Sequence, residues 1–159
     1  MQKESPVYFS KFFIVISLLV FVFAIYVFFA ISYGIGIVNG NSMAPTLKKG
    51  SVFVYVKETD IERMNIVAIK NKTTEETIVK RIIGLPFEVV KIKEGVIYIN
   101  GEQIEDVIDV YTYPGSNGDC FVLGSNEYFV IGDNRETSID SRTFGAVRRE
   151  EILGVLVGN

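Results

Sequence analysis

The amino-acid sequence predicts a mainly β protein, in which a single N-terminal transmembrane helix precedes an all-β domain of the barrel or sandwich type. Two observations lead to this fold class. Residues 12–32 form a run of 21 residues without a charged side chain, which is long enough for a membrane-spanning helix. From residue 34 onward, short segments rich in Val, Ile, Phe and Tyr are separated by Gly, Asn, Pro or charged clusters every eight to twelve residues, a spacing typical of all-β domains.

The apolar segment at residues 12–32 is interpreted as an uncleaved membrane anchor. At about 1.5 Å per residue, a helix of this length measures roughly 31 Å, the thickness of the hydrocarbon core of a bilayer. A cleavable secretory signal has a shorter apolar stretch of roughly 7–15 residues before a small-x-small site, and residues 30–32 (AIS) fit such a site only weakly. Lys3 and Lys11 precede the segment and no charge follows it until Lys48, which favours an N-terminus in the cytoplasm.

These observations divide the chain into three parts. Residues 1–11 are predicted to be a cytoplasmic tail, residues 12–33 a transmembrane anchor, and residues 34–159 an extracytoplasmic β domain. The predicted location is therefore the cell membrane, which the chain crosses once.

The strand pattern of the β domain consists of short segments that are rich in β-branched and aromatic residues and bounded by turn residues. These segments are residues 34–38, 51–57, 65–70, 76–84, 87–92, 95–101, 106–113, 127–132 and 152–157. Asn100 and Gly101 form a dipeptide that favours a tight hairpin turn, whereas residues 113–121 are interpreted as a surface loop. No segment outside the anchor has a helical period, so no further helix is expected.

Composition and charge exclude several classes of function. The net charge of −3 argues against a nucleic-acid partner. A single cysteine, Cys120, excludes an intrachain disulfide, and the absence of histidine argues against a zinc site. Neither a metal nor a cofactor is expected. Cys120 itself is predicted to be a small buried residue and not a nucleophile, because no imidazole can activate it.

Ser42 is the candidate nucleophile of the domain. It lies in the turn NGNSMAPTLKKG at residues 39–50, soon after the anchor ends. A Ser-His-Asp triad is excluded because the chain has no histidine, and the Ser-x-x-Lys spacing of penicillin-binding proteins does not occur. What remains for a serine hydrolase is a Ser-Lys dyad, in which the lysine pKa must fall from about 10.4 toward 7–8.

Lys80 is the candidate for such a base. Residues two positions apart in a strand share a face, and Lys80 is the lysine of the predicted β domain that has branched aliphatic residues, Ile78 and Ile82, on both sides along its face. Apolar surroundings would lower the pKa of its amine by desolvation. The pattern alone leaves open that Lys80 reaches past these neighbours into solvent, as most lysines do.

The polar segment GDNRETSIDSR, residues 132–142, follows an apolar strand. One interpretation is a tight turn at Asp133 and Asn134 within an exposed polar loop. The other is a buried polar network that positions another group, because hydroxyls and opposite charges are interleaved at close spacing. Composition does not decide between the two interpretations.

Three motifs, taken together, resemble the successive boxes of bacterial type I signal peptidases. They are GNSMAPTL, KRIIGLP and GDNRETSIDSRTFG, in this order behind the N-terminal span. These enzymes are membrane-bound Ser-Lys proteases that remove secretory leader peptides. The resemblance covers the anchor and nearly all of residues 36–158, and the short stretch between the second and third motifs is similar to the compact Gram-positive form. It implies a compact, partly open β-barrel-like catalytic domain.

The resemblance also implies catalytic roles for residues of the three motifs. Ser42 would be the nucleophile, Lys80 the general base, and Ser138 the hydroxyl that orients the lysine amine. Gly40 stands where some members carry a hydroxyl that helps to stabilise the oxyanion. Backbone N–H groups, including that of Ser42, are therefore expected to stabilise the oxyanion here.

Other matching residues have structural or substrate-binding roles in the family. Asp140 and Arg142 match an ion pair beside the site, and Arg81 and Asp133 match positions that hold the lysine strand to residues 132–142. The residues that match the family's pocket for small side chains are Met43, Leu47 and Val79.

The implied function is that of a membrane-anchored serine endopeptidase that removes N-terminal signal peptides from secreted preproteins. Its partners would be preprotein leader peptides and the lipid bilayer, without nucleic acid, metal or cofactor. The alternative from another class is a membrane-tethered, non-catalytic β domain that binds peptides or proteins.

Overall fold

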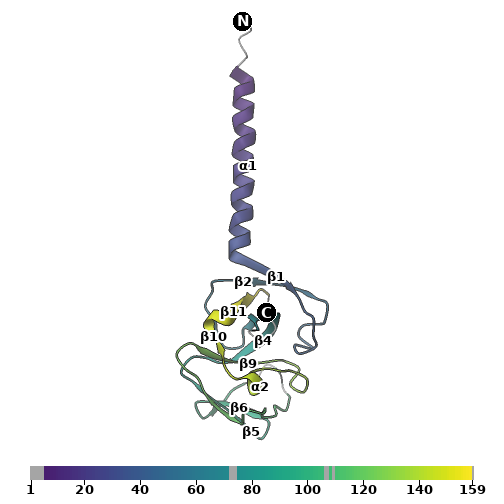
Figure 1. The fold of residues 1–159 in the computed structure, drawn as a ribbon, viewed down its shortest axis with the longest axis vertical. Coiled ribbons are helices and arrows are strands. Elements are labelled where there is room, and N and C mark those ends of the chain that lie inside the picture. Colours follow the sequence, from purple (N-terminus) through teal and green to yellow (C-terminus); the bar gives the residue numbers. More distant parts are fainter. Residues whose placement is uncertain (1–5, 72–74, 106–107, 109, 159) are drawn as a thin grey trace. The chain divides into compact units, whose positions relative to one another are not determined.

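The computed structural model describes residues 6–71, 75–105, 108 and 110–158. A long helix, α1 (Pro6–Ser32), belongs to a first compact unit that ends at Tyr33, and the strands form a second unit (Figure 1). The helix begins at a proline, which is tolerated in the first turn because its missing N–H has no partner there. Within α1, residues Lys11–Ser32 are long and apolar enough to cross a membrane, judged by length and composition.

Strands make up most of the regular secondary structure of the second unit, which confirms the mainly β fold class. The strands are β1 (Tyr33–Ile37), β2 (Val52–Val56), β3 (Ile66–Lys70), β4 (Thr77–Gly84), β5 (Val89–Lys93), β6 (Val96–Ile99), β7 (Glu102–Gln103), β8 (Cys120–Val122), β9 (Glu127–Ile131), β10 (Val147–Arg148) and β11 (Ile152–Leu156). In the described residues they form a seven-stranded sheet, with the order β1-β2-β11-β3-β4-β9-β10, and a four-stranded sheet, with the order β7-β6-β5-β8. The larger sheet curls into a half-barrel, in agreement with the predicted partly open barrel.

Strand β4 lies inside the larger sheet, antiparallel to β3 on one side and to β9 on the other. Its residues 79–84 are all buried, because both faces of the strand are covered by other parts of the domain. Alternate side chains of a strand point to opposite faces. Lys80 and Arg81 therefore face opposite sides of the sheet, and both are excluded from water.

The hairpin predicted at Asn100 and Gly101 is present. Strands β6 and β7 pair antiparallel, with Ile99 opposite Glu102. The two turn residues have φ angles of 53° and 90°. Two successive positive φ values define the type I′ turn that Asn-Gly sequences favour, so the local prediction was correct.

The strand predicted at residues 106–113 is wrong for the residues that the structure describes. Residues 108 and 110 lie in bends, residues 111–113 have no regular structure, and residues 106, 107 and 109 lie outside the described part. Thr112 is buried and donates its N–H to Gly95 O at 2.9 Å, whereas Tyr111 and Tyr113 are exposed. The composition that suggested a strand, rich in Val, Ile and Tyr, belongs here to a loop that bonds the β5–β6 turn through Thr112.

Three further differences concern short elements. The predicted loop at residues 113–121 ends in β8, which pairs with β5 and leaves Cys120 exposed instead of buried. Two short helices were not predicted, α2 (Ser141–Phe144) and the 3-10 helix η1 (Arg149–Glu151), nor was the two-residue strand β10. Asp140 caps α2 by accepting a hydrogen bond from Arg142 N–H. Elements of two to four residues have no period that a sequence pattern can reveal.

Candidate active site

Ser42 lies in a tight turn between β1 and β2. The turn is closed at its base, where Gly50 N–H donates to Val38 O at 2.7 Å, and internally, where Leu47 N–H donates to Met43 O at 2.8 Å. Met43 is buried in a core cluster that also contains Val38. The residue next to the serine is therefore anchored by packing, which leaves Ser42 itself at the surface of the domain.

Lys80 reaches Ser42 from β4. Its Nζ lies 2.7 Å from Ser42 Oγ, a hydrogen-bond distance between side chains 38 positions apart in the chain. Only 3% of the surface of Lys80 is exposed. The structure thus excludes the alternative in which this lysine extends into solvent, and it brings the two predicted dyad residues together.

The surroundings of Lys80 lower its pKa from 10.5 to about 8. The largest cause is burial, which disfavours the charged ammonium. The carboxylates of Asp140 and Asp133 act in the opposite direction, and the guanidinium of Arg142 lowers the pKa further. About a tenth of the amine is therefore neutral at pH 7, and about half at pH 8, which is the range in which a general base operates.

Two buried ion pairs flank the lysine. Arg81 donates to Asp133 from Nε at 2.8 Å and from Nη2 at 2.6 Å. Arg142 donates to Asp140 from Nε and from Nη2, both at 2.8 Å. Both carboxylates are fully buried. Asp133, Asp140 and Arg142 therefore belong to a buried polar network, and the interpretation as an exposed loop does not hold for them. Residues 136, 137 and 139 of the same segment are exposed.

Ser138 makes no hydrogen bond to the lysine amine in this conformation. Its Oγ is buried and has no hydrogen-bond partner within the described residues. It lies against Gly132, where an added Cβ would come within 2.2 Å of Ser138 Oγ and 2.4 Å of Ser42 O. The absence of a side chain at Gly132 thus lets Ser138 approach the turn at residues 39–50 that carries Ser42, called the nucleophile turn below. The orienting role of Ser138 stays a prediction.

An open cleft of about 460 Å³ begins at the serine and the lysine. One wall consists of residues 37–40 at the end of β1, and the other consists of residues 76–80 of the β4 edge. Met43 and Val79 line this cleft, and their role in a substrate pocket stays a prediction. Leu47 packs against the core cluster beneath the turn.

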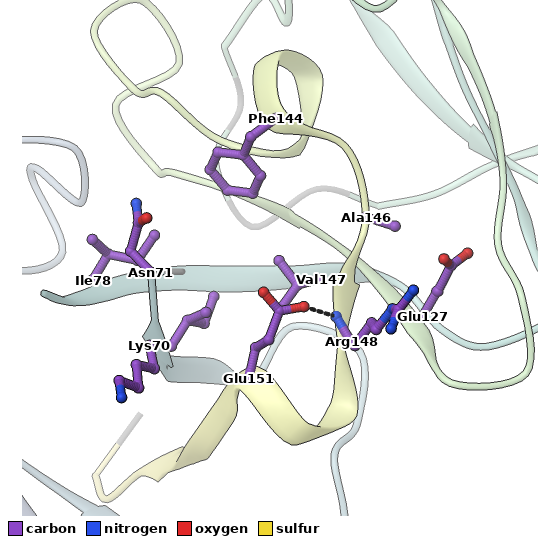
Figure 2. A pocket seen from close by; sticks show the side chains of 10 residues that line it. Lys70, Asn71, Ile78, Glu127, Phe144, Ala146, Val147, Arg148 and Glu151 are labelled. Atoms are coloured by element: carbon purple, nitrogen blue, oxygen red, sulfur yellow. Dashed lines mark hydrogen bonds between the residues drawn. The ribbon is translucent and has the colours of Figure 1, made fainter. Parts of the chain in front are cut away.

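A second cavity of about 480 Å³ lies beside α2 and β10 (Figure 2). Its lining residues are Ile69, Lys70, Asn71, Ile78, Glu127, Phe144, Ala146, Val147, Arg148 and Glu151. Its carboxylates already serve backbone groups, since Glu151 accepts from Arg148 N–H at 2.7 Å and Glu127 accepts from Gly124 N–H at 2.8 Å. Neither member of the candidate dyad lines this cavity, so it is not the candidate active site.

Two contacts of the nucleophile turn were not predicted. Thr46 Oγ1 donates to Asp133 Oδ2 at 2.5 Å, and Asn134 N–H donates to Ser42 O at 3.0 Å. Both connect the turn to a segment about ninety positions away. The only signal in the sequence was that these residues belong to the first and third motifs.

The fold and the site together define a class. A β domain that presents a turn serine to a buried lysine amine has the groups that a serine hydrolase without histidine needs. The arrangement contains a candidate nucleophile, a lysine of lowered pKa and an adjoining cleft.

Comparison with known proteins identifies the family within this class. The family model described as signal peptidase, peptidase S26, matches residues 8–158. Signal peptidase I V of Bacillus subtilis (strain 168) is 35% identical over 136 residues, covering 75% of this chain and 80% of that protein. Signal peptidase IB of Staphylococcus aureus (strain COL) is 32% identical over 138 residues, covering 74% and 72%.

A solved structure agrees with these relatives. The crystal structure of a signal peptidase I from Enterococcus faecalis V583 matches with a TM-score of 0.56 and 30% identity, over 62% of this chain and 98% of that chain. The chain belongs to the signal peptidase family, peptidase S26.

Proposed function

We propose that this signal peptidase cleaves preproteins with a Ser-Lys dyad, in which Ser42 is the nucleophile and Lys80 the general base. The observation that carries the proposal is the 2.7 Å distance between Lys80 Nζ and Ser42 Oγ. The lowered pKa of Lys80, about 8, supports it because the amine can then accept a proton near neutral pH. Ser138, Asp140, Arg142, Arg81 and Asp133 are proposed as supporting residues.

The reaction begins with neutral Lys80. Its Nζ takes the proton of Ser42 Oγ as the oxygen attacks the carbonyl carbon of the scissile bond, and the carbonyl oxygen becomes an oxyanion. Backbone N–H groups of the turn stabilise this charge, because Gly40 has no side-chain donor. The C–N bond then breaks, the ammonium of Lys80 gives its proton to the leaving amine, and water hydrolyses the acyl-enzyme by the same route.

The cleft beside the dyad is proposed to hold the leader peptide as an extended strand. Its two walls, residues 37–40 and residues 76–80, both belong to or adjoin strands, so backbone hydrogen bonds can bind a peptide largely independently of its sequence. Met43 and Val79 line the cleft with apolar side chains that are themselves buried, 1% and 7% exposed, and an apolar lining suits small side chains before the scissile bond.

The topology is proposed from the charges that flank the span. Residues 1–11 would form a cytoplasmic tail and residues 12–33 the anchor. Residues 34–159 would form the extracytoplasmic catalytic domain. Lys3 and Lys11 support this orientation, because basic residues near a span stay in the cytoplasm.

Preprotein cleavage tests the proposed function. The detergent-solubilised full-length chain is expected to cut a preprotein with alanine at positions −1 and −3 at a single site, and N-terminal sequencing of the product identifies the bond. A matched preprotein with phenylalanine at −1 is expected to remain uncut, because the proposed pocket beside Met43 and Val79 is one for small side chains. Binding of the preprotein without cleavage would favour a non-catalytic peptide-binding domain, and equal cleavage of both preproteins would contradict the assigned pocket.

The pH dependence of cleavage tests the identity of the base. Because the active form of Lys80 is neutral, kcat/KM is expected to rise with pH, with a midpoint near the pKa of about 8. The rate should fall about tenfold for each pH unit below about pH 7. Circular dichroism over the same range controls for unfolding. A rate that is flat between about pH 6 and about pH 9 would argue against an amine base.

A further inference from the structure

Asp133 receives hydrogen bonds from both sides of the candidate dyad. Arg81, the neighbour of Lys80 in β4, donates to it from Nε at 2.8 Å and from Nη2 at 2.6 Å. Thr46, in the turn that carries Ser42, donates from Oγ1 to the same carboxylate at 2.5 Å. One buried carboxylate is thus bonded to the strand of the lysine and to the turn of the serine.

Thr46 adds a polar attachment to the packing that holds the nucleophile turn. Near the serine, the turn is held by the buried side chain of Met43 and by the bond from Asn134 N–H to Ser42 O at 3.0 Å. Thr46 itself is exposed. Leu47, the next residue, packs against the core, and the Thr46 hydroxyl adds a bond to Asp133. Together with the bond from Asn134 to Ser42 O, it gives the turn two separated attachments to the segment at residues 133–134, which limit its rotation more than one does.

We propose that Thr46 is a positioning residue, whose hydroxyl uses Asp133 to hold the nucleophile turn at hydrogen-bond distance from Lys80. This inference rests on the Ser-Lys function proposed above. Asp133 is a suitable anchor because its side chain is fully buried and is itself fixed by two bonds from Arg81. A hydrogen bond to a carboxylate is stronger than one between neutral groups, so a single hydroxyl has a measurable effect.

The effect should appear in the chemical step. Proton transfer from Ser42 to Lys80 depends on the 2.7 Å distance between them, and a displacement of about 1 Å can cost about 10²-fold in rate. Thr46 does not line the cleft, so substrate binding should change little. Removal of its hydroxyl leaves the charge of Asp133 in place, so the pH midpoint set by Lys80 should not move.

The test compares Thr46→Val, which keeps the shape and removes the donor, with Thr46→Ser, which keeps the donor. Using the full-length chain in detergent and a preprotein substrate, Thr46→Val is expected to lower kcat about tenfold and to leave KM and the pH midpoint unchanged. Thr46→Ser is expected to restore most of kcat. Ser51→Ala is the matched control, because it removes another hydroxyl of the same loop, which bonds Lys48 O at 2.6 Å and not Asp133; it should behave as wild type.

Three results would overturn the positioning role. They are a wild-type kcat in Thr46→Val, a Thr46→Ser variant no better than Thr46→Val, and a loss of kcat no larger than the loss of folded protein measured by thermal unfolding. Ser42→Ala is assayed in parallel. If Ser42→Ala still cleaves, the proposed dyad itself fails, whereas an inactive Ser42→Ala beside a fully active Thr46→Val overturns only the role of Thr46.

Discussion

Replacement of Lys80 by methionine is expected to lower kcat/KM for preprotein cleavage by at least about 10³-fold and, at the same time, to stabilise the fold at neutral pH. The loss of activity follows because methionine cannot accept the proton of Ser42, whose Oγ lies 2.7 Å from the lysine amine in the native protein. Because methionine has a similar length and fits the apolar surroundings, the change removes a charge without leaving a cavity.

The gain in stability follows from the pKa shift of the same residue. The pKa of Lys80 is about 8 in the folded protein and 10.5 as its reference value. Below pH 8 the amine is charged in both states, so the folded state bears the full cost of the buried charge, about 3 kcal/mol. Between these two pKa values the unfolded chain binds more protons, so wild-type stability rises with pH, and the cost is gone above pH 10.5. The methionine variant lacks this dependence.

Ser42→Ala is the matched control for Lys80→Met. It should lose as much activity, because the two groups act as a unit, and the double variant should lose no more than either single variant. It should show no comparable gain in stability, because Ser42 is uncharged. Preprotein cleavage and thermal unfolding at pH 7 and above pH 10.5 provide the measurements. Residual cleavage by Lys80→Met near the wild-type rate, or a lower unfolding midpoint at pH 7, would contradict the assignment.

The burial of Lys80 is the feature of the site that could be predicted from the chain pattern. Branched aliphatic neighbours at Ile78 and Ile82 indicated an apolar face, and the structure places Lys80 in a strand covered on both sides. The pattern could not show that this face meets Ser42, because the contact joins residues 38 positions apart. The exclusion of other serine-hydrolase arrangements suggests a Ser-Lys dyad, and the resemblance to the family implies the same two residues.

The polar network could not be derived from spacing. Nothing around Asp133 distinguishes an exposed turn from a buried carboxylate, since its partners Arg81 and Thr46 come from two other segments of the chain. The error at residues 106–113 has the same origin. Residues 106–113 have the composition of a strand, but Thr112 is buried in a loop where Arg135 donates to its hydroxyl at 2.5 Å, and composition does not reveal such a distant contact.

Asp133→Ala is expected to destabilise the fold by about 3–5 kcal/mol, because it leaves the guanidinium of Arg81 buried without its counter-charge. In the native protein the two side chains are 6% and 0% exposed. After the substitution, Arg81 keeps its bond from Nη1 to Met64 O at 2.8 Å, but a neutral carbonyl does not replace a carboxylate. The free energy of unfolding of a domain is typically about 5–15 kcal/mol, so the expected loss is a large share of it. Chemical denaturation measures this loss.

The matched control is Lys70→Met, which breaks the exposed ion pair between Lys70 and Glu75, whose side chains are 53% and 69% exposed. The free energy of unfolding of this variant should fall by less than about 1 kcal/mol, because water already solvates both charges. Replacing Arg81 and Asp133 together by apolar residues should recover much of the stability, since no unpaired charge remains. If Asp133→Ala were as mild as Lys70→Met, the buried pair would not hold the segments together.

The carboxylate of Asp133 also raises the pKa of Lys80. Asp133→Asn should therefore move the pH midpoint of cleavage below that of wild type. This shift reports the electrostatic effect of Asp133 separately from its structural effect.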